Sequence, residues 1–146
     1  VKISIPQSVT YIGKNAFKEC KSLKEISIPS SVTSIECLTF DGCSSLKKVE
    51  IPPSVTSIGA WAFAKCSSLE EIKIPTSVSL IEKSAINSCT ALKNVVIPPS
   101  VKTIGEDAFK DCPLFKKPLN DTSHKAGKKK SPNFIKKKII LFIFYY

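Results

Sequence analysis

Apolar positions recur along the chain with a period of 23 residues. The motif Ile-x-Ile-Pro starts at Ile3, and the same pattern, with Val in some copies, starts again at Ile26, Val49, Ile72 and Val95. Each step is 23 residues without an insertion. A regular apolar period of this length is typical of stacked structural repeats, in which each copy contacts its neighbours. The sequence therefore predicts a repeat solenoid.

Several further sets of equivalent positions, called columns below, recur at the same spacing of 23 residues. They contain Val9, Val32, Val55, Val78 and Val101; Ile12, Ile35, Ile58, Ile81 and Ile104; Phe17, Phe40, Phe63, Ile86 and Phe109; and Leu23, Leu46, Leu69 and Leu92, with Phe115 in the same position. The unit reads L-x-x-I-x-I-P-x-S-V-x-x-I-G-x-x-A-F-x-x-C-x-x.

Within one unit the pattern predicts two extended segments and a turn of helix. Residues 26–28 alternate apolar and polar, as in a half-buried strand, and Pro29 ends that strand because proline donates no ladder hydrogen bond. Val32 and Ile35 suit a short second extended segment. Ala16, Phe17 and Cys20 are spaced like one turn of helix. Equivalent strands of successive coils should then stack as a parallel sheet.

The combination of L-x-x-I-x-I-P, S-V-x-x-I-G and A-F-x-x-C resembles the BspA-like leucine-rich repeat of bacterial and mucosal protist surface proteins. The resemblance covers residues 1–115. It implies a right-handed leucine-rich-repeat coil with a parallel β-sheet, short extended segments and a single helical turn per repeat. It also implies binding to other molecules, often outside the cell, and no catalytic residues.

One position of the repeat departs from the pattern in alternate units. Glu36 and Glu82 replace the glycine found at Gly13, Gly59 and Gly105. We therefore expect this position to be solvated and not to need glycine dihedral angles.

The positive charge is concentrated in the last residues. Residues 1–115 hold 13 Lys and 11 acidic residues, whereas residues 116–146 hold nine Lys and one acidic residue. We predict a solenoid over 1–117 and a basic, disordered tail over 118–146 with a short apolar end. The chain contains no Met and starts within a strand pattern, which predicts missing upstream repeats.

The tail allows three interpretations. Its lysine clusters suit nucleic acid or an anionic membrane, although the absence of Arg removes the usual bidentate contacts. Its apolar end, 139–146, is too short to span a bilayer but suits the start of a membrane segment. The third interpretation is that the tail is spurious translated sequence beyond the real repeats.

Five of the six cysteines form another column, Cys20, Cys43, Cys66, Cys89 and Cys112. Zinc sites use close pairs such as C-x2-C, which are absent here. The spacing predicts a ladder of buried thiols and no metal site. Cys37 lies outside the column, where we expect an exposed, unpaired thiol.

No catalytic constellation is visible. The single histidine, His124, lies in the tail, so no nucleophile–base pair is available in the repeats, and no Gly-rich phosphate loop is present. The sequence predicts a non-enzymatic protein without a cofactor or small-molecule substrate.

The polar positions of the first strand are the candidate ligand-binding residues, because they vary between repeats while the inward positions do not. They comprise Glu25, Ser27, Lys48, Glu50, Glu71, Lys73, Asn94 and Val96. The alternating charges in one column also suit ion pairs between adjacent coils. The alternatives are a solvated face stabilised by its own charges and a surface that contacts a ligand.

Two functions remain open at this point. The first is a monomeric module that binds host or matrix proteins, as part of a cell-surface or secreted adhesion-type protein. The second is a cytoplasmic protein-interaction scaffold whose basic tail contacts anionic partners.

Overall fold

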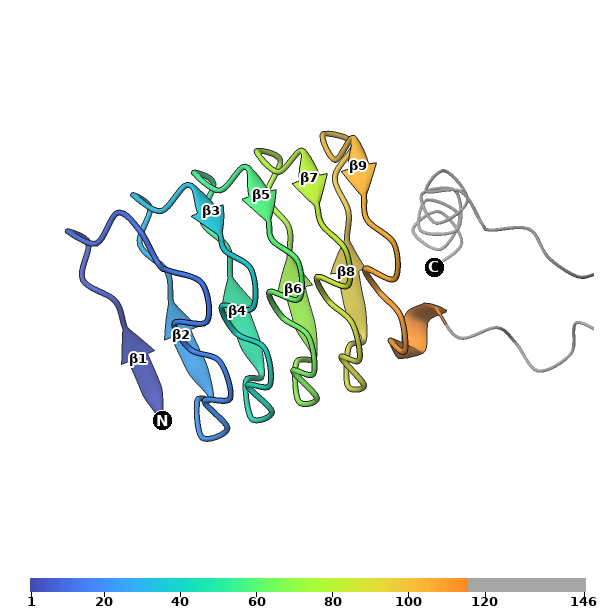
Figure 1. Ribbon diagram of the computed structural model, residues 1–146, viewed down its shortest axis with the longest axis horizontal. Helices are drawn as coiled ribbons and strands as arrows, with labels where there is room; N and C mark the ends of the chain where they lie inside the picture. The colour runs from blue at the N-terminus through green and yellow to red at the C-terminus, as the bar shows by residue number, and fades with distance from the viewer. Residues whose placement is uncertain (116–146) are drawn as a thin grey trace, which may run out of the picture.

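The structure, a computed structural model, describes residues 1–115, and each 23-residue unit in it forms one coil of a solenoid (Figure 1). The first strand of each coil joins a five-stranded parallel sheet in the order β1-β2-β4-β6-β8. Its strands are β1 (Lys2–Ser4), β2 (Glu25–Ser27), β4 (Lys48–Glu50), β6 (Glu71–Lys73) and β8 (Asn94–Val96).

The second extended segment of each coil forms a separate four-stranded sheet, in the order β3-β5-β7-β9. Its strands are β3 (Ser34–Ile35), β5 (Ser57–Ile58), β7 (Leu80–Ile81) and β9 (Thr103–Ile104). A short 3-10 helix, η1 (Pro113–Phe115), follows the last coil (Figure 1). The predicted solenoid and its two extended segments are therefore confirmed.

Adjacent coils pair residue for residue. Ile26 of β2 lies opposite Ile3 of β1 and Val49 of β4, and the same step of 23 residues holds in both sheets. The residues of one sequence column therefore lie next to one another in successive coils. The inward columns meet between the two sheets and form one continuous core.

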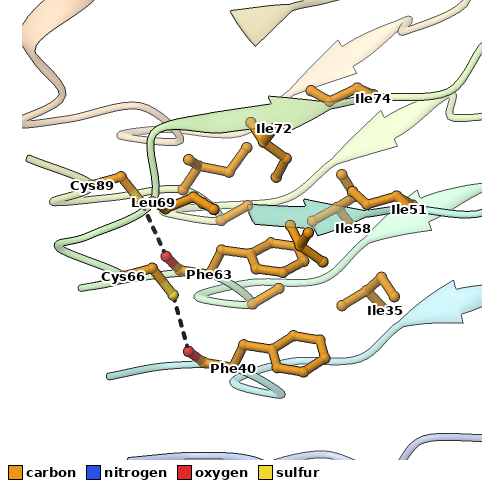
Figure 2. Packing of buried hydrophobic residues seen from close by; sticks show 14 of the residues in the cluster. Ile35, Phe40, Ile51, Ile58, Phe63, Cys66, Leu69, Ile72, Ile74 and Cys89 are labelled. Atoms are coloured by element: carbon orange, nitrogen blue, oxygen red, sulfur yellow. Dashed lines mark hydrogen bonds between the residues drawn. The ribbon is translucent and has the colours of Figure 1, made fainter. Parts of the chain in front are cut away.

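The phenylalanine column shows how closely the coils pack. The rings of Phe17 and Phe40 are stacked with their centroids 5.4 Å apart, and those of Phe40 and Phe63 are 5.2 Å apart. Phe40 and Phe63 are fully buried beside Ile35 and Ile58 (Figure 2). Because each ring fills the space above the previous one, the core depends on neighbouring coils being present.

The predicted turn of helix is absent, and hydrogen-bonded turns take its place. The amide of Phe40 donates to the carbonyl of Ala62 in the next coil at 2.8 Å, and Phe63 donates to Ala85 at 2.8 Å. A helix would direct these amides along their own coil. Left-handed residues on either side, such as Leu38 with φ 60°, also interrupt any helical run. These turns therefore bind coil to coil.

A serine ladder explains the S-V pair of the repeat. The hydroxyl of Ser54 donates to the carbonyl of Val32 in the preceding coil at 2.6 Å. Ser31, Ser77 and Ser100 make the equivalent bond at 2.7, 2.6 and 2.9 Å. Each serine thus satisfies a carbonyl that would otherwise lie unpaired beside the core.

The expectation for the glycine position was right about dihedral angles and right that Glu82 is exposed there, but it was wrong about solvation at Gly59. None of Gly13, Gly59 and Gly105 has a positive φ. Gly59 is nevertheless buried, and a Cβ there would lie 2.7 Å from the Cys37 nitrogen and 2.8 Å from the Glu36 carbonyl carbon. Glycine is required at this point because the backbone of the preceding coil approaches closely.

Replacing Gly59 with Ala should therefore destabilise the fold by about 1–3 kcal/mol, the usual cost of overpacking. Gly13→Ala is the matched control, because a Cβ at Gly13 meets only the Tyr11 ring carbon at 3.6 Å. Urea unfolding of both variants checks this. Equal stabilities of the two variants would contradict the close approach.

Candidate functional site

All eight candidate residues lie on the outer face of the five-stranded sheet. The middle residue of β2, β4 and β6 is buried, so the residues on either side of it project outward. Seven of the eight side chains are exposed, and Glu71 is half-buried. The structure thus brings Glu25, Ser27, Lys48, Glu50, Glu71, Lys73, Asn94 and Val96 together on one surface, called the sheet face below.

The charges of the sheet face pair with one another. Lys2 and Glu25 form an ion pair across adjacent coils at 3.1 Å, as the alternating signs predicted. The other two pairs differ from that prediction, because they form along a strand: Lys48 with Glu50 at 3.0 Å and Lys73 with Glu71 at 3.8 Å. Residues two apart on a strand share a face, so these long side chains reach each other. Together with Lys2 of β1, the five charged side chains of the sheet face carry three positive and three negative charges, which sum to zero.

A groove of about 560 Å³ lies over β1, β2 and β4. Its polar lining comprises Lys2, Glu25, Ser27, Lys48 and Glu50, and its apolar lining comprises Ile26, Ile28, Ile51, Pro52 and Pro53. The candidate residues on β6 and β8 lie outside the groove. The apolar lining was not predicted as part of a site, because the repeat pattern marks Ile28 and Ile51 only as inward core positions.

Ion pairing also sets the ionisation of this surface. A hydrogen bond with Glu50 raises the pKa of Lys48 above its ordinary value, and the same bond lowers the pKa of Glu50. A carboxylate whose pKa falls on folding contributes stability above its unfolded pKa. That contribution is lost as the pH falls through the folded pKa.

The predicted thiol ladder is present on the opposite side of the core. The Sγ of Cys66 donates to the carbonyl of Phe40 at 3.3 Å, and Cys89 donates to Phe63 at 3.2 Å (Figure 2). Burial raises the pKa of the Cys43 thiol to about 12 and raises that of Cys66 as well. All six cysteines are free. Four of them, Cys43, Cys66, Cys89 and Cys112, donate a hydrogen bond to a backbone carbonyl of the core.

Cys37 differs from its prediction. It is half-buried instead of exposed, because its backbone packs against Gly59 of the next coil.

Within residues 1–115, no group of three or more His, Cys, Asp or Glu side chains is placed to hold a metal ion. No helix in that part of the chain is both long and apolar enough to cross a bilayer. The predictions made for the tail and for His124 lie outside the described residues.

Parallel coils in strict register, with leucine and isoleucine columns turned inward, define a leucine-rich-repeat solenoid. Residues 1–116 match the BspA type leucine rich repeat region in six copies, and the chain belongs to this family. Such modules typically serve as non-catalytic scaffolds for protein–protein interaction. No curated protein matches the chain.

Three solved structures are similar. A leucine-rich repeat protein from Bacteroides ovatus is 40% identical with a TM-score of 0.73, over 76% of this chain and 29% of that one. A leucine rich repeat protein from T. pallidum is 39% identical with a TM-score of 0.73, over 76% of this chain and 54% of that one. A leucine rich cell surface protein from Faecalibacterium prausnitzii is 44% identical with a TM-score of 0.63, over 64% of this chain and 25% of that one. The chain therefore spans about half or less of their length.

Removing Lys48 tests the electrostatics of the sheet face. In Lys48→Gln, the pKa of Glu50 should rise toward its ordinary value, because the hydrogen bond that lowers it is lost. Carboxyl NMR titration at low salt measures this. Lys83→Gln is the control, because Lys83 pairs with Glu106 at 3.9 Å and not with Glu50. An unchanged Glu50 pKa in Lys48→Gln would contradict the assigned pair.

Proposed function

We propose that the chain is the protein-binding module of a cell-surface or secreted adhesion-type protein, and that its ligand is a host or matrix protein bound on the sheet face. The groove over β1, β2 and β4 carries this proposal. It combines apolar contact area with oriented charges, which is the composition of surfaces that bind other proteins.

The charge balance of the sheet face indicates what kind of ligand it suits. The ion pairs of Lys2, Lys48 and Lys73 leave no excess of either sign. Such a face gives little long-range attraction to a polyanion but offers both donors and acceptors at short range. A folded protein with mixed surface charge therefore suits it better than nucleic acid or a sulfated polysaccharide.

The surface location is supported by two observations. Four of the six free thiols among residues 1–115 are buried in the core, where oxidants reach them poorly, and the other two, Cys20 and Cys37, are half-buried. The fold is therefore compatible with an oxidising exterior. One similar solved structure is also described as a leucine rich cell surface protein.

The alternative is a cytoplasmic scaffold whose tail contacts anionic partners. The nine lysines among residues 116–146 favour it. It predicts binding that weakens steeply with added salt and is lost when residues 118–146 are removed.

A charge-swapped variant tests the sheet face. Lys48→Glu with Glu50→Lys and Glu71→Lys with Lys73→Glu keeps each local pair and the net charge but inverts the pattern shown to a ligand. We expect its affinity for a panel of immobilised extracellular-matrix proteins to fall at least tenfold, or about 1.4 kcal/mol. Surface plasmon resonance measures this.

The matched control swaps Glu70 and Lys93, which pair at 2.8 Å outside the groove. It should bind as the unaltered chain does. Equal binding by the sheet-face variant would overturn the assignment of the site. Antibody staining of the repeats only after cells are permeabilised would overturn the surface location.

A further inference from the structure

Two lysines lie next to each other where β2 and β4 begin. Lys24 directly precedes Glu25, the first residue of β2, and Lys47 directly precedes Lys48, the first residue of β4. The backbone amide of Lys47 donates to the carbonyl of Lys24 at 3.1 Å, so the two residues are in register in adjacent coils. Both are exposed. Strands stacked in this way lie about 4.8 Å apart, so two positive charges share one corner of the solenoid.

These two charges are not balanced by the protein. Neither ammonium forms an ion pair with a carboxylate of residues 1–115. Glu25, which follows Lys24, is paired with Lys2, and Glu70, the equivalent of Lys47 in the next coil, is paired with another lysine. Like charges in adjacent strands repel each other. The corner formed by Lys24 and Lys47 therefore favours a negatively charged group from outside the chain.

The groove that begins beside this corner is apolar at its other end. Ile28 and Ile51 follow the last residues of β2 and β4, and they line the groove together with Pro52 and Pro53. A strand rises about 3.3 Å per residue, so the four residues from Lys24 to Ile28 span roughly 13 Å. The surface thus combines a cationic corner with an apolar end at a fixed separation.

We propose that this surface binds an extended segment of the partner protein that carries one carboxylate and, about four residues away, an aliphatic side chain. The carboxylate lies between Lys24 and Lys47, and the aliphatic group contacts Ile28, Ile51 and the adjacent prolines. An extended segment matches the separation because its residues advance by the same rise as the strands beneath it. The inference rests on the proposed function and specifies the part of the ligand that the groove recognises.

The groove suits such a segment better than a polyanion. Glu25 and Glu50 line it between the cationic corner and the apolar end. A continuous chain of phosphates or sulfates would meet these carboxylates and would gain nothing from the isoleucines. A single carboxylate avoids both costs, because complementary charge is needed at one corner only.

A labelled peptide tests the pairing of the two ends. The probe is Glu-Ser-Gly-Ser-Leu-Pro, amidated at its C-terminus and carrying a neutral fluorophore, and its binding to the full-length chain is followed by fluorescence anisotropy. We expect replacement of its Glu by Gln, or of its Leu by Ser, to weaken binding about fivefold. The inference is overturned if the probe does not bind, if neither replacement matters, or if only the Glu matters and heparin displaces the probe completely.

The variant Lys24→Gln with Lys47→Gln should also weaken probe binding about fivefold and should remove most of its salt dependence. The matched control is Lys65→Gln with Lys102→Gln, which removes the same charge from two exposed lysines outside the groove. It should bind the probe as the unaltered chain does. Equal probe binding by the two variants would contradict the inference.

The same variants separate this inference from the proposed function. A matrix protein whose binding falls in the sheet-face charge swap but not in Lys24→Gln with Lys47→Gln would leave the proposed function standing and overturn the inference. Binding that falls in both, but not in Lys65→Gln with Lys102→Gln, is the expected result.

Discussion

The register between coils is the constraint on which the rest of the structure depends. Each residue lies next to the residue 23 positions earlier in the preceding coil. Backbone hydrogen bonds between adjacent coils hold this alignment in the first sheet, in the second sheet and in the turns. The Phe17–Phe40–Phe63 stack, the serine ladder and the thiol ladder all need this alignment. A coil that slipped by one residue would turn its strand over and place charges such as Glu25 in the core. Insertions are therefore excluded from the repeat, while substitutions at outward positions are free to accumulate.

Because substitutions at outward positions leave the core intact, the sheet face can change to suit a ligand. Its strands are held by buried residues such as Ile26, Val49 and Ile72, so the outward side chains add little to the core. Lys48 and Glu50 are fixed relative to each other by their own pair. A rigid surface with such pre-arranged charges loses little conformational entropy when it binds another protein.

Much of the fold was predictable from the sequence, because a 23-residue period without insertions leaves few ways to stack the coils. The two strands and the thiol ladder followed directly from it. The turns did not, because apolar spacing around Phe17 fits a helix and a tight turn equally well. The close approach at Gly59 was also hidden, since Glu82 at the same position suggested open space. For the site, alternation identified the outward residues but not the ion pairs along β4 and β6, which depend on side-chain rotamers. It also could not mark Ile51 as part of a groove, because Ile51 is an inward position whose side chain is buried.

Removal of one repeat tests the role of register most directly. Deleting residues 47–69 removes 23 residues and joins Leu46 to Glu70 with every column still aligned. Deleting residues 47–70 removes one residue more and displaces every later coil by one position. Hydrogen exchange and urea unfolding of the two proteins should show a cooperative, slightly less stable solenoid for the first and a loss of protection beyond the junction for the second. Equal protection and stability in the two proteins would show that register is not what holds the coils together.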